Sequence, residues 1–228
     1  MLDWLLPQPC LACGLPAAGG LCPPCAAGLP WNDRACRRCA LPLPSADDAA
    51  LCGRCLRHPP PATASFVLLR YADPVDRWMA ALKFSRRLAC GELLSALMRQ
   101  RLGAAPWIAG CAAHIPMPLH PGRLRERGFN QVTELLRPLQ DALPEARPGW
   151  LQRLRPAPPQ SGLDAAHRRR NLRGAFAADP AVRGRCLLLV DDVVTTGSTV
   201  NEAARCLLRA GAAEVRVLGW ARAARGMR

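Results

Sequence analysis

The 228-residue chain has little aromatic content, one tyrosine, one lysine and no long hydrophobic run. A membrane helix needs about 20 apolar residues, whereas the longest apolar stretches here, such as residues 187–190, stop at charged residues. We therefore expect no membrane insertion. The amino terminus has an acidic residue, Asp3, and no basic segment before its short apolar stretch, so it does not resemble a secretory signal. These absences predict a cytoplasmic protein.

The charge of the chain is strongly basic. Lys and Arg together number 31 against 17 Asp and Glu, which gives a formal net charge of +14, and half of the residues are hydrophobic. This composition excludes an intrinsically disordered chain. Every basic residue except Lys83 is an arginine. Because the two cations are not interchangeable, the single lysine predicts a site that needs a compact ammonium group, the alternative being that it survives by chance in an arginine-biased sequence.

The composition changes near residue 60. Residues 1–60 are rich in Cys and Pro and hold five basic and four acidic residues, whereas residues 61–228 hold 26 basic and 13 acidic ones. The segment 58–64, HPPPATA, cannot continue a helix or a central strand and is predicted to be a linker. We therefore predict a small module in residues 1–60 and a larger, basic domain in residues 61–228.

The small module contains four Cys-x2-Cys pairs. In the reducing cytoplasm such an array predicts metal binding rather than disulfides, and two pairs complete the four thiolates that hold a structural Zn²⁺. Eight ligands therefore predict two zinc ions, which would stabilise a segment too poor in large apolar residues to fold alone. Pairing of the first with the second and the third with the fourth is slightly favoured over interleaving, and the spacing leaves both open. The ligands are Cys10, Cys13, Cys22, Cys25, Cys36, Cys39, Cys52 and Cys55.

The larger domain alternates predicted strands and helices. Apolar runs predict strands at 65–71, 112–115, 186–190 and 214–218, and helical periodicity predicts helices at 74–102 (broken near Ser85 and Gly91), 131–143 and 198–209. Residues 120–130 are predicted to be a loop, and residues 147–173 an exposed loop followed by a basic helix. The order predicts an α/β fold with a mostly parallel sheet and a ligand at the carboxyl ends of its strands.

The segment 187–199, LLLVDDVVTTGST, has the features of a phosphate and ribose site. A buried strand is followed by two acids and by a Gly and hydroxyl loop that enters a helix, whose amides can bind a phosphate. The carboxylates can hold ribose hydroxyls directly or through Mg²⁺. The predicted ligand-binding residues are Asp191, Asp192, Thr195, Thr196, Gly197, Ser198 and Thr199.

This segment closely resembles the phosphoribosyl pyrophosphate (PRPP) motif of type I phosphoribosyltransferases. Other stretches extend the resemblance to the ComF family over nearly the whole chain: Tyr71 to Pro74, Lys83-Phe84, Ile115 to Pro121, Arg127 to Gln131, Pro159-Gln160, Arg170-Asn171 and the paired cysteines. Ala157 departs from the family pattern, where a Thr is expected. The resemblance implies a type I phosphoribosyltransferase-like domain behind a double zinc-ribbon-like module.

The resemblance also implies further site residues and partners. Loops that bind pyrophosphate or close over the ligand are assigned to Lys83, Pro116, Met117, Arg123, Arg127, Asn130, Gln131, Gln160 and Asn171. The implied ligand is PRPP with Mg²⁺, and the implied role is DNA uptake in natural transformation, with single-stranded DNA and DNA-uptake proteins as partners. The alternative is an active phosphoribosyltransferase with an unidentified acceptor. The candidate base-stacking residues are Trp78, Trp107, Phe129 and Trp150.

Overall fold

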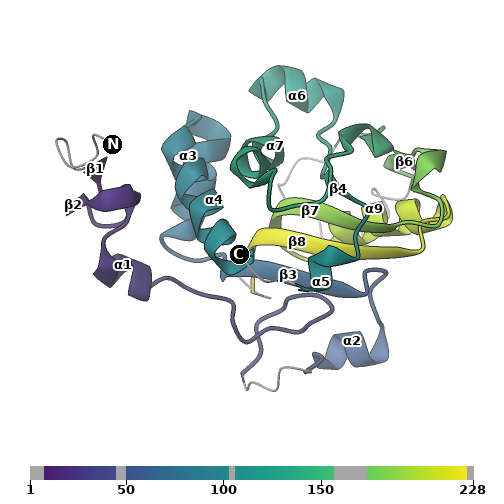
Figure 1. Ribbon diagram of the computed structural model, residues 1–228, viewed down its shortest axis with the longest axis horizontal. Coiled ribbons are helices and arrows are strands. Elements are labelled where there is room, and N and C mark those ends of the chain that lie inside the picture. Colours follow the sequence, from purple (N-terminus) through teal and green to yellow (C-terminus); the bar gives the residue numbers. More distant parts are fainter. Residues whose placement is uncertain (1–7, 45–49, 103–105, 157–173, 225–228) are drawn as a thin grey trace.

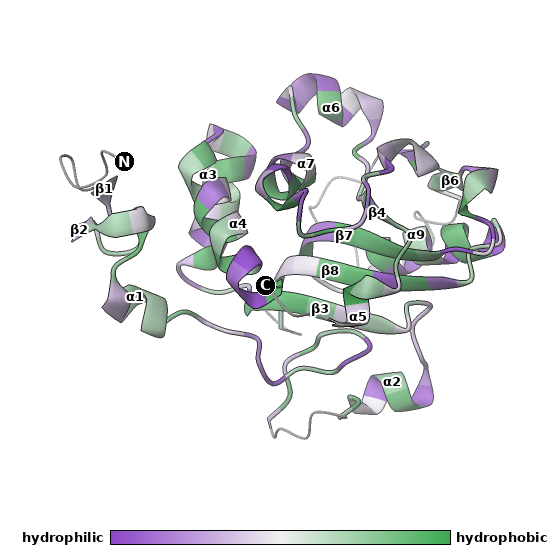
Figure 2. Ribbon diagram, in the orientation of Figure 1, coloured by the Kyte–Doolittle hydropathy of each residue, from purple (hydrophilic) through white to green (hydrophobic). Residues whose placement is uncertain are grey.

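The computed structural model describes residues 8–44, 50–102, 106–156 and 174–224 (Figure 1). Its centre is a four-stranded parallel sheet in the order β3 (Ala64–Arg70), β8 (Glu214–Arg222), β7 (Cys186–Val194) and β4 (Ala113–Pro116). The hydrophobic residues of these strands lie in the core of the protein (Figure 2). The predicted mostly parallel α/β fold is confirmed.

Strand β7 is longer than its apolar run. The sequence predicted an end at Val190, but β7 pairs with β8 as far as Val194, so Asp191 lies opposite Gly219 inside the sheet. Gly219 leaves room for this pairing, since a Cβ there would lie 3.2 Å from Val67 Cγ2 and 3.4 Å from the carbonyl oxygen of Asp191. The two acids are therefore held by a strand rather than by a loop.

Helices α3 (Val75–Ser85), α4 (Leu88–Leu102) and α7 (Gln131–Leu136) cover one face of the sheet. The predicted break near Ser85 is confirmed, because Arg86 takes a left-handed conformation (φ 51°) that ends α3. The predicted break at Gly91 is wrong. Gly91 lies inside α4, where a Cβ would come within 3.3 Å of Leu82, so glycine allows α3 and α4 to pack closely.

Two predictions between residues 120 and 143 were wrong. The expected loop contains α6 (Pro121–Arg127), because His120 caps its first turn by accepting a hydrogen bond from the Gly122 amide and Gly128 ends it at φ 80°. Helix α7 is shorter than predicted. Pro138 lacks an amide hydrogen, and the chain tightens there into the 3-10 turn η2 (Arg137–Leu139).

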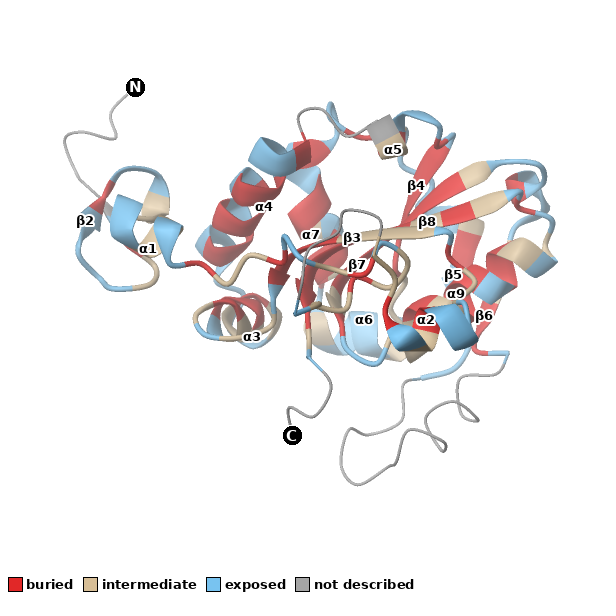
Figure 3. Cartoon of the chain, turned by 90° about the horizontal axis from the view of Figure 1, so that it is seen from below, coloured by how far each residue is buried: buried red, intermediate tan, exposed pale blue. Residues whose placement is uncertain are grey.

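The opposite face carries α9 (Ser198–Arg209) and the part of the cysteine-rich segment with α2 (Gly53–Arg57), whereas the part with α1 (Pro23–Ala27) lies beside α3 and α4 (Figure 1). Figure 3 shows α9 and α2 close together on this side. Helix α9 has its predicted bounds. Three short helical elements are η1 (Ala18–Gly20), η4 (Pro180–Val182) and α5 (Pro106–Ala109).

The basic stretch 147–173 differs from its prediction in the part that the structure describes. After η3 (Pro148–Trp150), strand β5 (Leu151–Arg153) pairs antiparallel with β6 (Phe176–Ala178) instead of forming a loop. Phe176 and Leu151 are buried, which supplies the apolar anchor for this small sheet. The predicted basic helix lies outside the described residues.

Candidate functional sites

The eight paired cysteines gather into two groups of four. Within each group the sulfur atoms lie within 4.8 Å of one another, and the pairing is sequential. The Cys13 and Cys22 sulfurs are 3.7 Å apart, as are those of Cys39 and Cys52. Sulfurs at ~2.3 Å from a tetrahedral Zn²⁺ are about 3.8 Å apart, so the spacing fits zinc. Cluster 1 is Cys10, Cys13, Cys22 and Cys25, and cluster 2 is Cys36, Cys39, Cys52 and Cys55.

The two clusters repeat one local structure. In the first Cys-x2-Cys turn of each, a left-handed residue follows the second cysteine, namely Gly14 (φ 80°) in cluster 1 and Ala40 (φ 54°) in cluster 2. The amides of Gly14 and Ala40 donate to the carbonyl oxygens of Cys10 and Cys36, at 2.8 and 2.7 Å. The second pair of each cluster begins a short helix, α1 or α2, whose amino terminus favours thiolates.

Backbone hydrogen bonds stabilise the thiolate of one cysteine in each cluster. Burial alone would raise the pKa of Cys10, but amide hydrogen bonds, above all from Cys22, outweigh it and lower the pKa to about 6. Amide hydrogen bonds act against burial in the same way at Cys36, whose pKa falls to about 7. The donor set, its spacing and its backbone therefore fit two structural zinc ions.

Both clusters are attached to the larger domain. Trp78 of α3 donates from its indole nitrogen to the carbonyl oxygen of Leu11, within cluster 1, at 3.1 Å. Next to cluster 2, Ser65 of β3 donates to the carbonyl oxygen of Arg38 at 2.6 Å. Asn32 links the clusters' connecting segment to β3 by donating to Val67 at 3.1 Å. The cysteine-rich segment is thus bonded to the sheet rather than tethered by a free linker.

The acid pair of β7 meets the lone lysine. Lys83 Nζ, at the end of α3, lies 2.6 Å from Asp192 Oδ2, and the Asp192 side chain is only 6% exposed. Despite this close approach, Oδ2 is buried without a hydrogen bond of good geometry within the described residues. An under-coordinated carboxylate oxygen at the end of a parallel strand fits a ligand hydroxyl or a divalent cation.

The surroundings of Asp191 disfavour its charged form. Burial and the neighbouring Asp192 charge raise the pKa of Asp191 to about 8, although Lys83 opposes the rise. Its Oδ1 accepts the Asp192 amide at 3.0 Å. Arg153 of β5 is also close enough to respond: burial lowers the pKa of Arg153 and the Asp191 charge opposes that effect. Because burial and Asp192 disfavour the charged form of Asp191, a cation bound beside it would lower its pKa and favour its carboxylate.

The loop after β7 has the form of a phosphate cradle. Gly197 adopts φ 76° immediately before α9, and Thr195 and Thr196 are exposed. The hydroxyls of Thr196 and Ser198 are 2.9 Å apart. The loop thus presents amides and hydroxyls at the amino terminus of a twelve-residue helix, next to the acid pair.

The residues assigned to the pyrophosphate and closing loops are partly brought together. Pro116 ends β4, and the Met117 amide donates to the carbonyl oxygen of Val190 at 2.7 Å, which fixes the loop beside β7. Asn130 caps α7 and donates from Nδ2 to the Met117 carbonyl oxygen at 3.1 Å. These bonds give Asn130 a structural role as well.

Of the two arginines assigned to these loops, Arg127 lies near the acid pair. Arg127 bonds the side chain of Gln131, and the charge of Asp192 acts on the Arg127 pKa, which burial lowers. Arg123 is exposed and pairs with Glu126 at 3.5 Å. Gln160 and Asn171 lie outside the described residues.

An exposed aromatic residue outside the predicted stacking set lies beside the site. Phe84 follows Lys83 directly and is 74% exposed, with the Arg127 guanidinium 5.7 Å from its ring centre. Arg86 lies 5.6 Å from the ring centre of Phe129. The stacking predictions for Trp78 and Phe129 were wrong, since Trp78 is 3% exposed and bonded to Leu11 in cluster 1, and Phe129 is 8% exposed. In the sequence, the indication that Phe84 belongs to the site was the Lys83-Phe84 stretch, which resembles the ComF family.

Known families match both parts of the chain. The double zinc ribbon domain family matches residues 1–56, and the phosphoribosyl transferase domain family matches residues 155–225. The DNA utilization protein YhgH of Escherichia coli O157:H7 is 42% identical over 173 residues, which cover 73% of this chain and 75% of that protein. The chain belongs to the ComF family.

Other ComF-family relatives cover more of the chain. The DNA utilization protein YhgH of Salmonella typhimurium is 37% identical over 222 residues, covering 93% of this chain and 96% of that protein. Competence protein F of Haemophilus influenzae is 31% identical over 187 residues, covering 75% and 78%. A solved allosteric regulatory enzyme of purine biosynthesis gives a TM-score of 0.35 at 19% identity, covering 55% of this chain and 24% of that one, too weak a likeness to support a conclusion.

Proposed function

We propose that this ComF-family protein binds PRPP with Mg²⁺ and takes part in DNA uptake in the cytoplasm, where it handles single-stranded DNA. The observation that carries the PRPP proposal is the contact of the only lysine with the Asp192 carboxylate beside the 195–199 loop. We also propose residues 1–60 and 61–228 as the two domains. The double zinc ribbon match, which ends at residue 56, supports that division.

Different residues of the chain are assigned to different parts of PRPP. The amides and hydroxyls of residues 195–199 would bind the 5′-phosphate, and Asp191 and Asp192 would hold the ribose hydroxyls directly or through Mg²⁺. The family resemblance assigns the pyrophosphate to the loop of Met117 and to Arg123 and Arg127, whose guanidinium groups can bind its oxygens. Mg²⁺ would supply the positive charge that the acid pair lacks.

Titration calorimetry with PRPP and Mg²⁺ tests this assignment. Wild type should bind PRPP, and Asp192→Asn should bind it at least tenfold more weakly, because one neutral amide replaces the carboxylate that approaches Lys83. Asp141→Asn is a matched control, since Asp141 pairs with Arg99 on the exposed surface. Equal binding by wild type and Asp192→Asn would refute the assignment.

The DNA proposal rests on the names of the relatives and on the surface next to the acid pair. YhgH proteins are named for DNA utilization and the Haemophilus influenzae relative for competence. Phe84, with Arg127 beside it, offers an exposed ring and a cation, the two features that bind single strands without sequence preference. The net charge of +14 favours a polyanionic partner.

Fluorescence anisotropy with a labelled oligo(dT) tests the DNA proposal. Phe84→Ala and Arg127→Ala should each weaken binding, and Arg77→Ala, on an exposed side of the same helix α3, should not. Binding should also fall steeply with salt, because backbone contacts release counterions. Absence of binding at low salt would refute single-strand handling.

An active phosphoribosyltransferase with an unidentified acceptor is the second candidate. The observation in its favour is that the exposed Phe84 ring adjoins Lys83, so a base-like acceptor has a place to stack beside the acid pair. Release of pyrophosphate from PRPP in the presence of a panel of bases tests it. Release that depends on a base and is lost in Asp191→Asn would support catalysis.

A further inference from the structure

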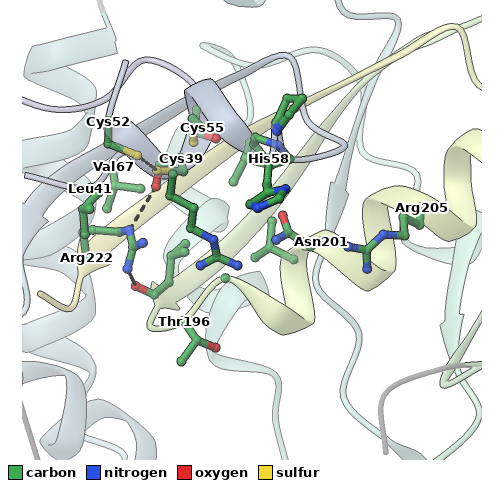
Figure 4. Close-up of a pocket in the computed structure, with 18 residues that line it drawn as sticks. Cys39, Leu41, Cys52, Cys55, His58, Val67, Thr196, Asn201, Arg205 and Arg222 are labelled. Carbon is green, nitrogen blue, oxygen red and sulfur yellow. Dashed lines mark hydrogen bonds between the residues drawn. The ribbon is translucent and has the colours of Figure 1, made fainter. Parts of the chain in front are cut away.

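One buried side chain joins cluster 2 to the phosphate loop. Arg222 ends β8 and is 5% exposed. Its Nε donates to the carbonyl oxygen of Cys39 at 3.0 Å, and its Nη1 donates to the carbonyl oxygen of Val194 at 2.9 Å (Figure 4). The same nitrogen donates to Thr195, the first residue of the loop. A zinc-ligating residue and the start of the loop therefore share one guanidinium.

The chemistry of arginine suits this position. A guanidinium carries five donors in a fixed plane, so it can bind carbonyl groups on opposite sides at once, which an ammonium cannot do with the same geometry. One of its acceptors, Cys39, lies in cluster 2. A zinc ion bound there would fix the distances between the four sulfur atoms. Zinc bound by the Cys39 sulfur would restrain the backbone of that residue, and Arg222 connects the Cys39 carbonyl oxygen to those of Val194 and Thr195.

A pocket beside Arg222 makes its hydrogen bonds more important for the position of the 195–199 loop. A pocket of about 150 Å³ lies between cluster 2 and the first turns of α9, with Cys55 and His58 on one side and Asn201 and Arg205 on the other (Figure 4). Water can enter a space of this size, so cluster 2 and α9 are not closely packed against each other at this point. Direct polar links such as Arg222 therefore contribute more to the position of the loop here than they would in a closely packed interface.

We propose that Arg222 is a positioning residue through which cluster 2, when it holds zinc, keeps the 195–199 loop in its phosphate-binding shape. The proposal rests on PRPP binding as the proposed function. The zinc module then has a role beyond its own folding, namely to hold the ligand-binding loop in position. Loss of zinc from cluster 2 weakens PRPP binding by way of Arg222, so the state of the zinc module is communicated to the ligand site.

Calorimetric titration of PRPP and Mg²⁺ into Arg222→Gln is the first test. Affinity should fall on the order of tenfold, within the ~5–150-fold range of typical coupling between sites. Arg216→Gln is the matched control, because Arg216 lies on the same strand and is half-buried, and it donates to Glu214 and Trp107 away from the loop. A folded Arg222→Gln that binds PRPP within twofold of wild type would overturn the proposal. If Arg222→Gln does not fold, Arg222→Lys, which keeps the positive charge, takes its place in this titration.

A double-mutant cycle tests the zinc part of the proposal. Cys52→Ser removes one ligand of cluster 2 and should weaken PRPP binding in the wild-type background. In the Arg222→Gln background it should cause little further loss, because the link is already broken. If the two losses multiply instead, cluster 2 and Arg222 act independently and the proposed coupling is wrong.

Hydrogen exchange of the ligand-free protein separates this proposal from PRPP binding itself. Amides of residues 194–201 should exchange faster in Arg222→Gln than in wild type and remain protected in Arg216→Gln. This measurement needs no PRPP, so it still tests the link if wild type does not bind PRPP and the proposed function fails. Unchanged exchange at these amides would refute the link.

Discussion

Lys83 Nζ lies 2.6 Å from Asp192 Oδ2 and so joins the end of α3 to the buried end of β7, 109 positions further along the chain. The lysine side chain is 20% exposed and the aspartate 6%. The contact brings the only lysine to the acid pair and places Phe84 on the rim of the same site. It also limits the repulsion between Asp191 and Asp192 when no ligand is bound.

Replacing this lysine should destabilise the protein. Lys83→Met leaves a buried carboxylate without its cation, so the free energy of unfolding should fall by ~1–3 kcal/mol, less than for a fully buried pair because Lys83 is partly exposed. Arg77→Met, which removes an exposed pair with Asp73, should cost less than ~1 kcal/mol. Urea unfolding measures both. A cycle with Asp192→Asn should show a coupling of about 1 kcal/mol or more, and additive losses would contradict the pair.

Stability of the ligand-free protein should depend on the pH through Asp191. Its pKa rises from 3.8 to about 8 on folding, because of burial and the Asp192 charge, so between these values the folded state binds a proton that the unfolded state has released. The free energy of unfolding should therefore fall as the pH rises from about 4 to about 8. Unfolding in Mg²⁺-free buffer between pH 5 and 8 measures this slope. Asp191→Asn should reduce it, and an unchanged slope would contradict the assignment.

A side chain at Gly197 should damage the phosphate loop. The residue has φ 76°, where a Cβ is strained even though the nearest neighbour, Asn201 Nδ2, would be 3.8 Å away. Gly197→Ala should cost ~1–2 kcal/mol and weaken PRPP binding. Gly184→Ala is the control, since Gly184 has φ 71° and open space around it, remote from the loop. If both variants lose stability but retain equal PRPP affinity, the loop does not hold the phosphate.

The protein should bind two zinc ions that can be removed separately. Cys13→Ser and Cys52→Ser each disable one cluster, so metal analysis should give one zinc per chain for each variant and two for wild type. A chelator should lower the melting temperature of wild type, because a bound metal stabilises only the folded chain. Complete zinc loss in both variants would show that the clusters do not form independently.

Local patterns predicted much of this architecture. The Cys-x2-Cys spacing identified all the zinc ligands because four thiolates close in sequence leave few other arrangements, and the alternating elements predicted the parallel sheet. Helix α9 has its predicted bounds, since a glycine before it and apolar residues along one face fix both its start and its period. One error arose where a residue acted through a partner on another helix, as at Gly91, which packs on Leu82. Another arose from a local cap that the prediction missed, the His120 ring that begins α6.

The sequence by itself determined the cysteine clusters, the order of strands and helices and the acid and glycine loop, because each depends on residues a few positions apart. Only the tertiary structure decided the sequential pairing of the cysteines, the contact of Lys83 with Asp192, the exposure of Phe84 and the bridge that Arg222 makes from Cys39 to Thr195. The Arg222 bridge, for example, joins residues 27 and 183 positions apart. No local periodicity encodes such contacts, since they arise when packing of the sheet and its two faces brings remote side chains together.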